Sequence, residues 1–588
     1  MAGWGSLKMH PWPEPIVMQE LPEYMIPSYL IPVDHMPITA NGKLDRKALF
    51  SLIKHGNDEE ANLSKSIDEE KLATIWADVL QLPEKQISVT SDFFDIGGHS
   101  LNATILQAKV EKQLGSVISL RQIFSTSSLR DMAALLTTDQ KEQVLIPRVK
   151  PAAHYPATSG QRRLYALQKL DENSVSYNIS GCVQVYGTIE HAKVTSAIEA
   201  IALIQDAFRT TFDTIDHQLV QQIADQIDIS VETIESDHEN INFHDYVRPF
   251  DLQNGPLFRV SIIRTPTDSL NYLLFDIHHI IADGLSMKRI IEDFKLAYEG
   301  QNLIAPPLQY QDYSAWLQSA DYSKLLKPQI DYWHKEFANG FTRLALPLDF
   351  NRPELIMDDG GDITHVLNSQ RAESLKKLIK GANVTAFSMF TTLLSTLLSR
   401  ICQSQEVIIG TPVVNRPHDD LMKVVGFFTN MLPIVNQVHT DEQFDAYLKQ
   451  VHQKVLEVLE NQQYLFEDLA KTVDPHRKPG HNPIFDVVLE FDNLDLPGLT
   501  IDDAKVSFVN QHSQKSKFDL LIQIAPTGDL FRFRFQYRKS LFEESTIQWM
   551  MDSFISLIDD VVANPAIKIG ALNSHERQST SEEIEFEF

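Results

Sequence analysis

The feature that most constrains this fold is a long block of alternating strand and helix patterns that runs from residue 153 to residue 575. Residues 272–277 read YLLFDI, which is apolar apart from Asp276 and typical of a buried strand, and residues 286–298 carry apolar side chains at helical spacing. This alternation predicts an α/β fold, and a block of this length exceeds a single hydrophobic core. We therefore expect two lobes, residues 153–325 and 326–575, with a cleft between them.

A shorter, helical stretch precedes this block at residues 66–136. Apolar residues from position 72 to position 80 fall on one helical face, a second helix is predicted over 100–114, and a third over 128–136. The second helix is expected to end at Gly115 and to turn four side chains inward, namely Leu101, Ile105, Val110 and Leu114. Short helices in this number predict a small all-α bundle, and residues 137–152 are interpreted as the linker that follows it.

The two ends of the chain lack this periodicity. Residues 1–20 are interpreted as a leader outside the fold, and residues 576–588 as an acidic, solvated tail. Residues 21–50 contain a short apolar run but are too few to bury a core of their own. They are therefore interpreted as a fragment of another domain.

Charge and composition exclude several classes of partner. Acidic residues (79) outnumber basic ones (52) to give a net charge of −27, and such a surface repels nucleic-acid phosphates and anionic lipids. The only cysteines, Cys182 and Cys402, are far apart, so neither a disulfide framework nor a metal site is expected. No apolar run reaches about 18 residues, and no secretory signal is visible. We expect a monomeric, cytoplasmic protein that binds neither nucleic acid nor membranes.

The first chemical signal is the sequence DFFDIGGHSL at residues 92–101. Gly97 and Gly98 permit a tight turn, and Ser100 then opens the second predicted helix, where free N–H groups favour a phosphate ester on its hydroxyl. An ordinary N-cap serine is the alternative. The stretch resembles the attachment motif of peptidyl carrier proteins. The resemblance implies a four-helix bundle that carries 4'-phosphopantetheine covalently on Ser100, and a phosphopantetheinyl transferase as partner.

The fragment at residues 21–50 resembles the final motif of adenylation domains, which precede carrier domains in nonribosomal peptide synthetases. Lys43 stands at the position of that family's substrate-contacting lysine. The segments that would build a nucleotide pocket are missing, so we expect no adenylation activity here. The resemblance implies an upstream adenylation domain as a partner.

The second chemical signal is the sequence HHIIADG at residues 278–284, which follows the predicted strand at 272–277. Because successive strand residues point to opposite faces, one histidine should face a cleft while the other packs or hydrogen-bonds. A purely structural histidine pair is the alternative.

This second sequence resembles the HHxxxDG active-site motif of condensation domains, which share a two-lobed fold with chloramphenicol acetyltransferase. Further matches follow in family order: TSGQRRLY at 158–165, FRTTF at 208–212, YQDYSAW at 310–316, GFFTN at 426–430, NQQYLFE at 461–467, NPIFD at 482–486 and SKFD at 516–519. Two departures stand out, because Gly160 replaces the usual alanine and residues 204–206 read IQD where the family has RHE.

The resemblance implies amide formation between a donor thioester on the carrier and the α-amine of the next aminoacyl thioester, with downstream adenylation and carrier domains as partners. His279 either accepts the amine proton or holds the amine in place. The Gly284 N–H stabilises the oxyanion. In the family, His278 is structural and Asp283 pairs with the arginine at position 163, Arg163. Two further candidates for the cleft are Asn430 and Ser286.

Three alternatives stay open from the sequence. An epimerisation domain shares both the fold and HHxxxDG, an acyl-CoA-dependent acyltransferase would leave the carrier-like region incidental, and a non-catalytic scaffold would not need His279.

Overall fold

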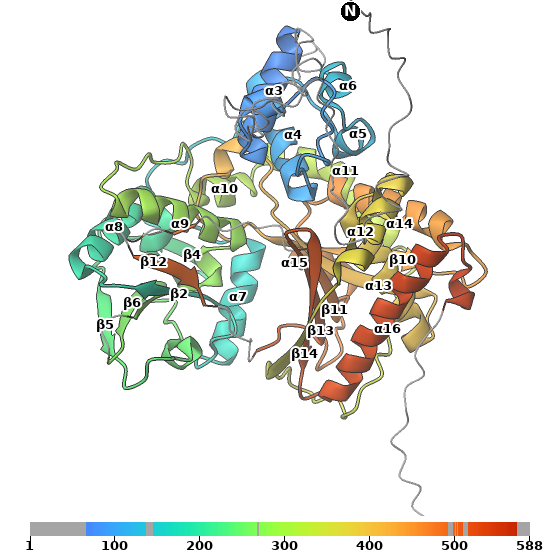
Figure 1. The fold of residues 1–588 in the computed structure, drawn as a ribbon. Coiled ribbons are helices and arrows are strands. Elements are labelled where there is room, and N and C mark those ends of the chain that lie inside the picture. The colour runs from blue at the N-terminus through green and yellow to red at the C-terminus, as the bar shows by residue number, and fades with distance from the viewer. Residues whose placement is uncertain are drawn as a thin grey trace, which may run out of the picture.

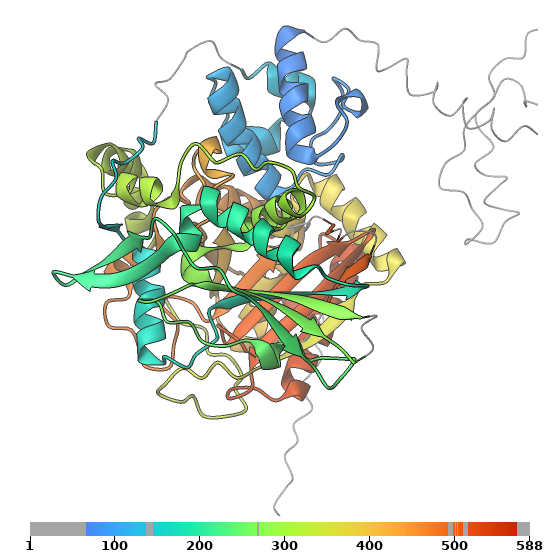
Figure 2. The ribbon, with the colours of Figure 1, turned by 90° about the vertical axis from the view of Figure 1, so that its left-hand side faces the viewer.

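The computed structural model describes residues 66–136, 145–266, 270–491, 498–499, 501, 504–509 and 515–572, with backbone only at Ser100 and Leu101. The predicted leader, the adenylation-like fragment with Lys43, the acidic tail and most of the linker lie outside the described residues. Figures 1 and 2 place a small helical domain at one end of a two-lobed body.

The helical domain contains α3 (Ile67–Leu80), α4 (Ser100–Leu114), α5 (Leu120–Ser125) and α6 (Leu129–Ala133). A capping box at Ser66 starts α3, and the rings of Trp76 and Phe93 meet edge to face with centroids 5.0 Å apart in its core.

The predicted inward face of α4 is confirmed at its three described positions, since Val110 is fully buried and Ile105 and Leu114 pack against the core. The fully buried positions are Ala103, Leu106 and Val110, whereas Ile105 and Leu114 are only half-buried. The core-facing stripe of the helix is therefore wider than expected, since it also includes Ala103 and Leu106. Gly115 ends the helix in the left-handed conformation with φ +66°, as predicted.

The N-lobe is built on a five-stranded sheet of order β12-β2-β7-β6-β5. Its strands are β2 (Asn178–Tyr186), β5 (Val231–Glu235), β6 (Phe258–Arg264), β7 (Asn271–His278) and β12 (Lys505–Phe508). A smaller sheet joins β1 (Tyr155–Pro156), β4 (Gln218–Ile223) and β3 (Thr210–Ile215), and the helices are α7 (Ser159–Leu170), α8 (His191–Ile204), α9 (Gly284–Tyr298) and α10 (Tyr310–Trp316). Every residue of β7 is buried, which explains why most of its side chains are apolar.

The C-lobe is built on a six-stranded sheet of order β10-β9-β11-β13-β14-β8. Its strands are β8 (Gly360–Val366), β9 (Glu406–Val413), β10 (Asn430–Gln437), β11 (Val487–Phe491), β13 (Leu520–Thr527) and β14 (Leu530–Arg538). Its helices are α11 (Ala320–Glu336), α12 (Ser369–Ala382), α13 (Ala386–Cys402), α14 (Phe444–Glu460), α15 (Phe466–Val473) and α16 (Glu544–Ala563). Within the described part of the chain, no single helix is long and apolar enough to cross a membrane; α12 and α13 pass together as a bent pair by length and composition only.

The expected boundary between the lobes at residues 325 and 326 does not separate the two sheets completely. Strand β12 comes from the C-terminal part of the chain but pairs antiparallel with β2 of the N-lobe, with Phe508 opposite Val183. Without β12 the strand β2 would expose unpaired backbone groups at the sheet edge, so the crossing satisfies them and ties the lobes together.

Candidate active site and carrier site

His279 lies immediately after β7, in the short helix η5 (His279–Ile281), and its side chain is half-buried. Its Nδ1 lies 2.8 Å from the carbonyl oxygen of Ala282. Because a carbonyl oxygen only accepts hydrogen bonds, Nδ1 carries the proton and Nε2 keeps its lone pair. Burial and the nearby charge of Lys517 lower the pKa of His279 to about 4, so the imidazole is neutral at pH 7. The site therefore presents a neutral proton acceptor.

His278 is fully buried at the last position of β7, whereas His279 is half-buried at the first position of η5. Its Nδ1 accepts the N–H of Ile280 at 3.1 Å, and its Nε2 lies 3.3 Å from Gln168 Oε1. Burial, followed by the neighbouring charges, lowers its pKa to about 3. With both ring nitrogens engaged, His278 holds the turn that presents His279. His279 lies in η5 and not in β7, so strand alternation does not place the two rings.

Asp283 is also buried, and it caps the first turn of α9. Its Oδ1 accepts the N–H of Ser286 at 2.8 Å and a hydrogen bond from Arg416 Nη2 at 3.0 Å, and its Oδ2 accepts the N–H of Phe428 at 3.0 Å. Arg416 is itself 1% exposed and stacks on the Phe428 ring, 4.0 Å from the centroid. This buried pair joins the two lobes behind His279.

The expected pairing of Asp283 with Arg163 is therefore wrong. Arg163 lies on α7, where its Nη1 binds Glu467 of α15 at 3.1 Å. The first turn of α9 directs Asp283 toward the loop before β10, and Arg416 reaches it from there. Glu467 in turn neutralises Arg163 across the lobe boundary.

Ser286 and Asn430 do not line an open cleft, contrary to expectation, because both are at most 2% exposed. The Ser286 hydroxyl accepts hydrogen bonds from Gly426 N–H at 3.1 Å and from Arg416 at 3.0 Å. Asn430 donates to the carbonyls of Gln462 and Tyr464 at 2.8 and 2.9 Å, and its oxygen accepts two backbone N–H groups. Both side chains therefore hold loops together.

Gly284 is the first residue of α9, where backbone N–H groups have no partner one turn earlier in the helix. Beside it, the ring of Phe427 packs edge to face against His279, with centroids 5.0 Å apart. A Cβ at Gly160 would lie 2.6 Å from Phe427 Cε1. The departure from the family at Gly160 thus leaves room for the ring that packs against His279.

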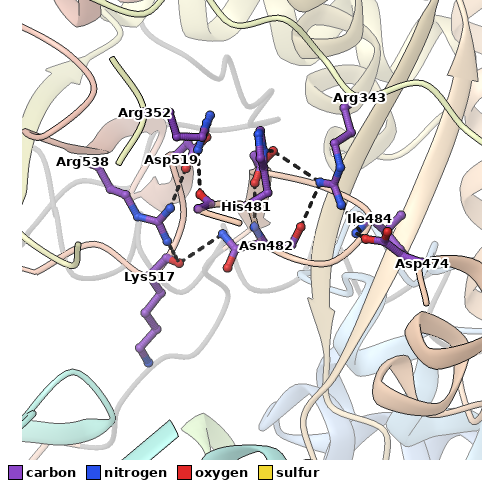
Figure 3. Close-up of polar contacts among 11 residues, drawn as sticks. Arg343, Arg352, Asp474, His481, Asn482, Ile484, Lys517, Asp519 and Arg538 are labelled. Carbon is purple, nitrogen blue, oxygen red and sulfur yellow. Dashed lines mark hydrogen bonds and ion pairs between the residues drawn. The ribbon is translucent and has the colours of Figure 1, made fainter. Parts of the chain in front are cut away.

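Lys517 is a further residue of the site that its sequence pattern did not indicate, although it lies inside the matched SKFD sequence. Arg538 Nη2 donates to its backbone carbonyl at 2.6 Å, and Asp519 binds Arg538 at 2.6 Å. Figure 3 shows the side chain leaving this network toward the cyan ribbon of the N-lobe, and its Nζ lies 5.2 Å from the centroid of the Tyr177 ring. The N–H of His279 donates to the Tyr177 carbonyl at 2.8 Å. Tyr177 therefore contacts both Lys517 and His279. Burial and the Arg163 charge lower its pKa to about 8.

The backbone around Ser100 suits a phosphate ester. Gly97 has φ +111°, and a Cβ at Gly98 would lie 2.4 Å from Phe93, so both positions require glycine. Ser100 opens α4, whose first turn contains no acidic residue and presents free N–H groups. In the part of the chain that the structure describes, no cluster of three or more His, Cys, Asp or Glu could hold a metal ion.

Comparison with known proteins agrees with this geometry. Residues 152–582 match the condensation domain family, and residues 70–136 match the family described as phosphopantetheine attachment site. Tyrocidine synthase 2 of Brevibacillus parabrevis is 32% identical over 93% of this chain and 15% of its own length, and bacitracin synthase 3 of Bacillus licheniformis is 32% identical over 92% and 9%. The chain thus spans less than a sixth of the length of these relatives.

Among solved structures, the X-domain from teicoplanin biosynthesis aligns with a TM-score of 0.68 at 20% identity, over 73% of this chain and 100% of its own. A four-domain nonribosomal peptide synthetase aligns with a TM-score of 0.64 at 20% identity, over 73% of this chain and 34% of its own. These likenesses support the two-lobed fold. The chain therefore belongs to the condensation domain family and carries a phosphopantetheine attachment domain in front of it, the carrier–condensation arrangement of nonribosomal peptide synthetases.

Proposed function

We propose that this chain joins a donor acyl group, held on phosphopantetheine at Ser100, to the α-amine of an acceptor aminoacyl thioester, with His279 at the reacting amine. The bound cofactor supplies the thiol that carries the donor as a thioester. The observation that carries the proposal is the half-buried His279, whose Nδ1–H is fixed on Ala282 so that Nε2 remains a proton acceptor.

In this reaction a C–N bond forms, the donor C–S bond breaks, the thiol leaves and the amine nitrogen loses one proton. A free α-amine has a pKa of about 7.7–8.0, well above the pKa of about 4 at His279. His279 is therefore a weak base toward a free ammonium group. It suits a different role, in which Nε2 accepts a hydrogen bond from the neutral amine and takes the proton once the nitrogen becomes acidic during bond formation.

Charge on the reacting carbonyl oxygen needs stabilisation at the same moment. The Gly284 N–H at the start of α9 is one donor, since the helix terminus carries partial positive charge. The Arg416–Asp283 pair fixes the first turn of α9 and so holds this donor beside His279.

The partners follow from the same proposal. A phosphopantetheinyl transferase modifies Ser100, an upstream adenylation domain loads the donor, and downstream adenylation and carrier domains supply the acceptor. We place this reaction in the cytoplasm and the chain in it as a monomer.

The test is a single-turnover assay on the full chain after modification by a phosphopantetheinyl transferase and loading with an aminoacyl donor. Intact mass should rise in the wild type and not in Ser100→Ala. With a soluble aminoacyl thioester as acceptor, the wild type should form the dipeptide, and His279→Ala should form it at least about a hundredfold more slowly. His154→Ala is the matched control, because His154 is exposed.

Loading of Ser100→Ala would refute the carrier assignment. Equal dipeptide formation by His279→Ala and His154→Ala would remove His279 from the chemistry. Inversion of the donor stereocentre without amide formation would instead establish an epimerisation domain.

A further inference from the structure

The helical domain contacts the C-lobe through two lysines on α4, Lys109 and Lys112, which we call the basic strip. Lys112 Nζ lies 2.6 Å from Asp420 Oδ1 and 3.0 Å from Asp419 Oδ2, both in the short helix η6 (Asp419–Leu421). Lys109 Nζ lies 3.4 Å from Asp419 and 2.7 Å from Asp78 of the helical domain itself. We call Asp419 and Asp420 the acidic ledge.

Three further contacts fix the orientation of the domain on the C-lobe, and the first is an ion pair of opposite polarity, since Asp95 of the helical domain lies 2.7 Å from Lys380 Nζ on α12. On α5, Arg121 lies 3.6 Å from Glu457 of α14, and the Phe124 ring packs edge to face against His452, with centroids 6.4 Å apart. Figures 1 and 2 agree in showing the helical domain stacked on this end of the body.

The charge of these contacts is unlike that of the chain as a whole. The net charge is −27, yet Lys109, Lys112 and Arg121 of the helical domain all meet carboxylates of the C-lobe, whereas the Asp95–Lys380 pair has the reverse order. Complementary charge of this kind steers association and sets register more than it adds affinity. On a strongly acidic protein, a basic strip opposite an acidic ledge is a specific orienting device.

This orientation aligns the modified face of α4 with a cavity. Four α4 residues at helical spacing line a cavity of about 180 Å³ together with residues of the C-lobe. The α4 residues are Thr104, Gln107, Ala108 and Glu111, and the C-lobe residues include Asn415 and Arg416. The register of α4 puts position 100 on the same face, one turn before Thr104.

Arg416, which lines the cavity, connects the acidic ledge to the HHxxxDG motif at residues 278–284. Its Nη1 donates to the carbonyls of Leu421, at the end of η6, and of Val424, while its Nη2 binds Asp283. The side chain of Arg416 therefore links the surface that receives α4 to the turn that presents His279.

We propose that the acidic ledge is the docking site for the donor-loaded carrier, which it recognises through the basic strip on α4. Docking there turns the Ser100 face of the helix toward the cavity in front of Arg416. This inference rests on the proposed function, since it names the surface by which that site receives its donor.

Charge exchange in the full-length, modified and loaded chain tests the proposal. In low salt, Lys112→Glu should slow single-turnover amide formation about fivefold, because an attractive contact with the acidic ledge becomes repulsive. Asp420→Lys should slow it similarly, and the double variant Lys112→Glu/Asp420→Lys should recover most of the wild-type rate. Lys71→Glu, an exposed change of equal charge on α3, is the matched control.

A second arm supplies the donor as a soluble pantetheine thioester, which needs no docking. All four variants should then react at the wild-type rate, and mass gain with the transferase checks that each carrier folds. Equal rates for Lys112→Glu and Lys71→Glu from the loaded carrier, or failure of the double variant to recover, would overturn the docking site. Absence of product from both donors in the wild type would instead refute the proposed function.

Discussion

Replacement of Arg416 by methionine tests how the charge of Asp283 is held behind His279. The two side chains are 0% and 1% exposed, and their closest atoms lie 3.0 Å apart. Methionine keeps much of the packing on Phe428 but leaves a buried carboxylate without its cation. Removal of one partner of a buried ion pair costs about 3–5 kcal/mol. The free energy of unfolding of the condensation domain should fall by this amount.

Arg163→Met is the matched comparison, because its side chain is 32% exposed and binds Glu467. Pairs with this exposure contribute about 0–1 kcal/mol, so this variant should remain close to wild type. Urea unfolding of the full chain, followed by tryptophan fluorescence with Trp316 and Trp333 as reporters in this domain, measures both changes.

The double variant Arg416→Met/Asp283→Asn should recover part of the loss, since it also removes the uncompensated charge. If Arg163→Met were as destabilising as Arg416→Met, Arg163 and not Arg416 would be the cation that Asp283 requires, and the reasoning would fail.

Three further predictions concern His279 and its surroundings. Lys517→Met removes a cation that lowers the pKa of His279, so the acid limb of the rate–pH profile should move to higher pH; an unmoved limb would show that Lys517 does not act on the imidazole. Gly160→Ala should push Phe427 away from His279 and slow amide formation about tenfold with little change in melting temperature, and an unchanged rate would contradict this role of the ring. His278 has its pKa lowered from 6.5 to about 3, so its stabilising effect is complete above pH 6.5 and is lost as pH falls toward 3. Between pH 6.5 and 5, urea unfolding should therefore show a loss of stability about 1–2 kcal/mol larger in the wild type than in His278→Gln, and equal losses would argue against a buried neutral ring.

Much of the fold could be predicted because local periodicity in the sequence determines it. The apolar positions that become β7 and the helix that starts at Ser100 and ends at Gly115 follow from spacing within one element. Even here spacing indicated only part of the covered face of α4, which also includes Ala103 and Leu106.

The polar partners in the site could not be predicted from spacing. Asp283 and Arg416 are 133 residues apart in the sequence, and Arg163 is an equally plausible cation until the loop before β10 is placed. Ser286 and Asn430 have polar side chains of the kind that line active-site clefts, yet packing buries both.

By itself, the sequence determined the two chemical motifs, the helical domain before a two-lobed α/β body, and the elements that present Ser100 and His279. Only the tertiary structure decided which cation holds Asp283, that β12 crosses to the N-lobe, that Lys517 reaches His279, and which surface of the C-lobe faces α4. The physical reason is the distance along the chain over which each kind of interaction acts. Hydrogen-bonding geometry and side-chain periodicity act over a few residues, whereas ion pairing, burial and strand exchange depend on groups that packing alone brings together.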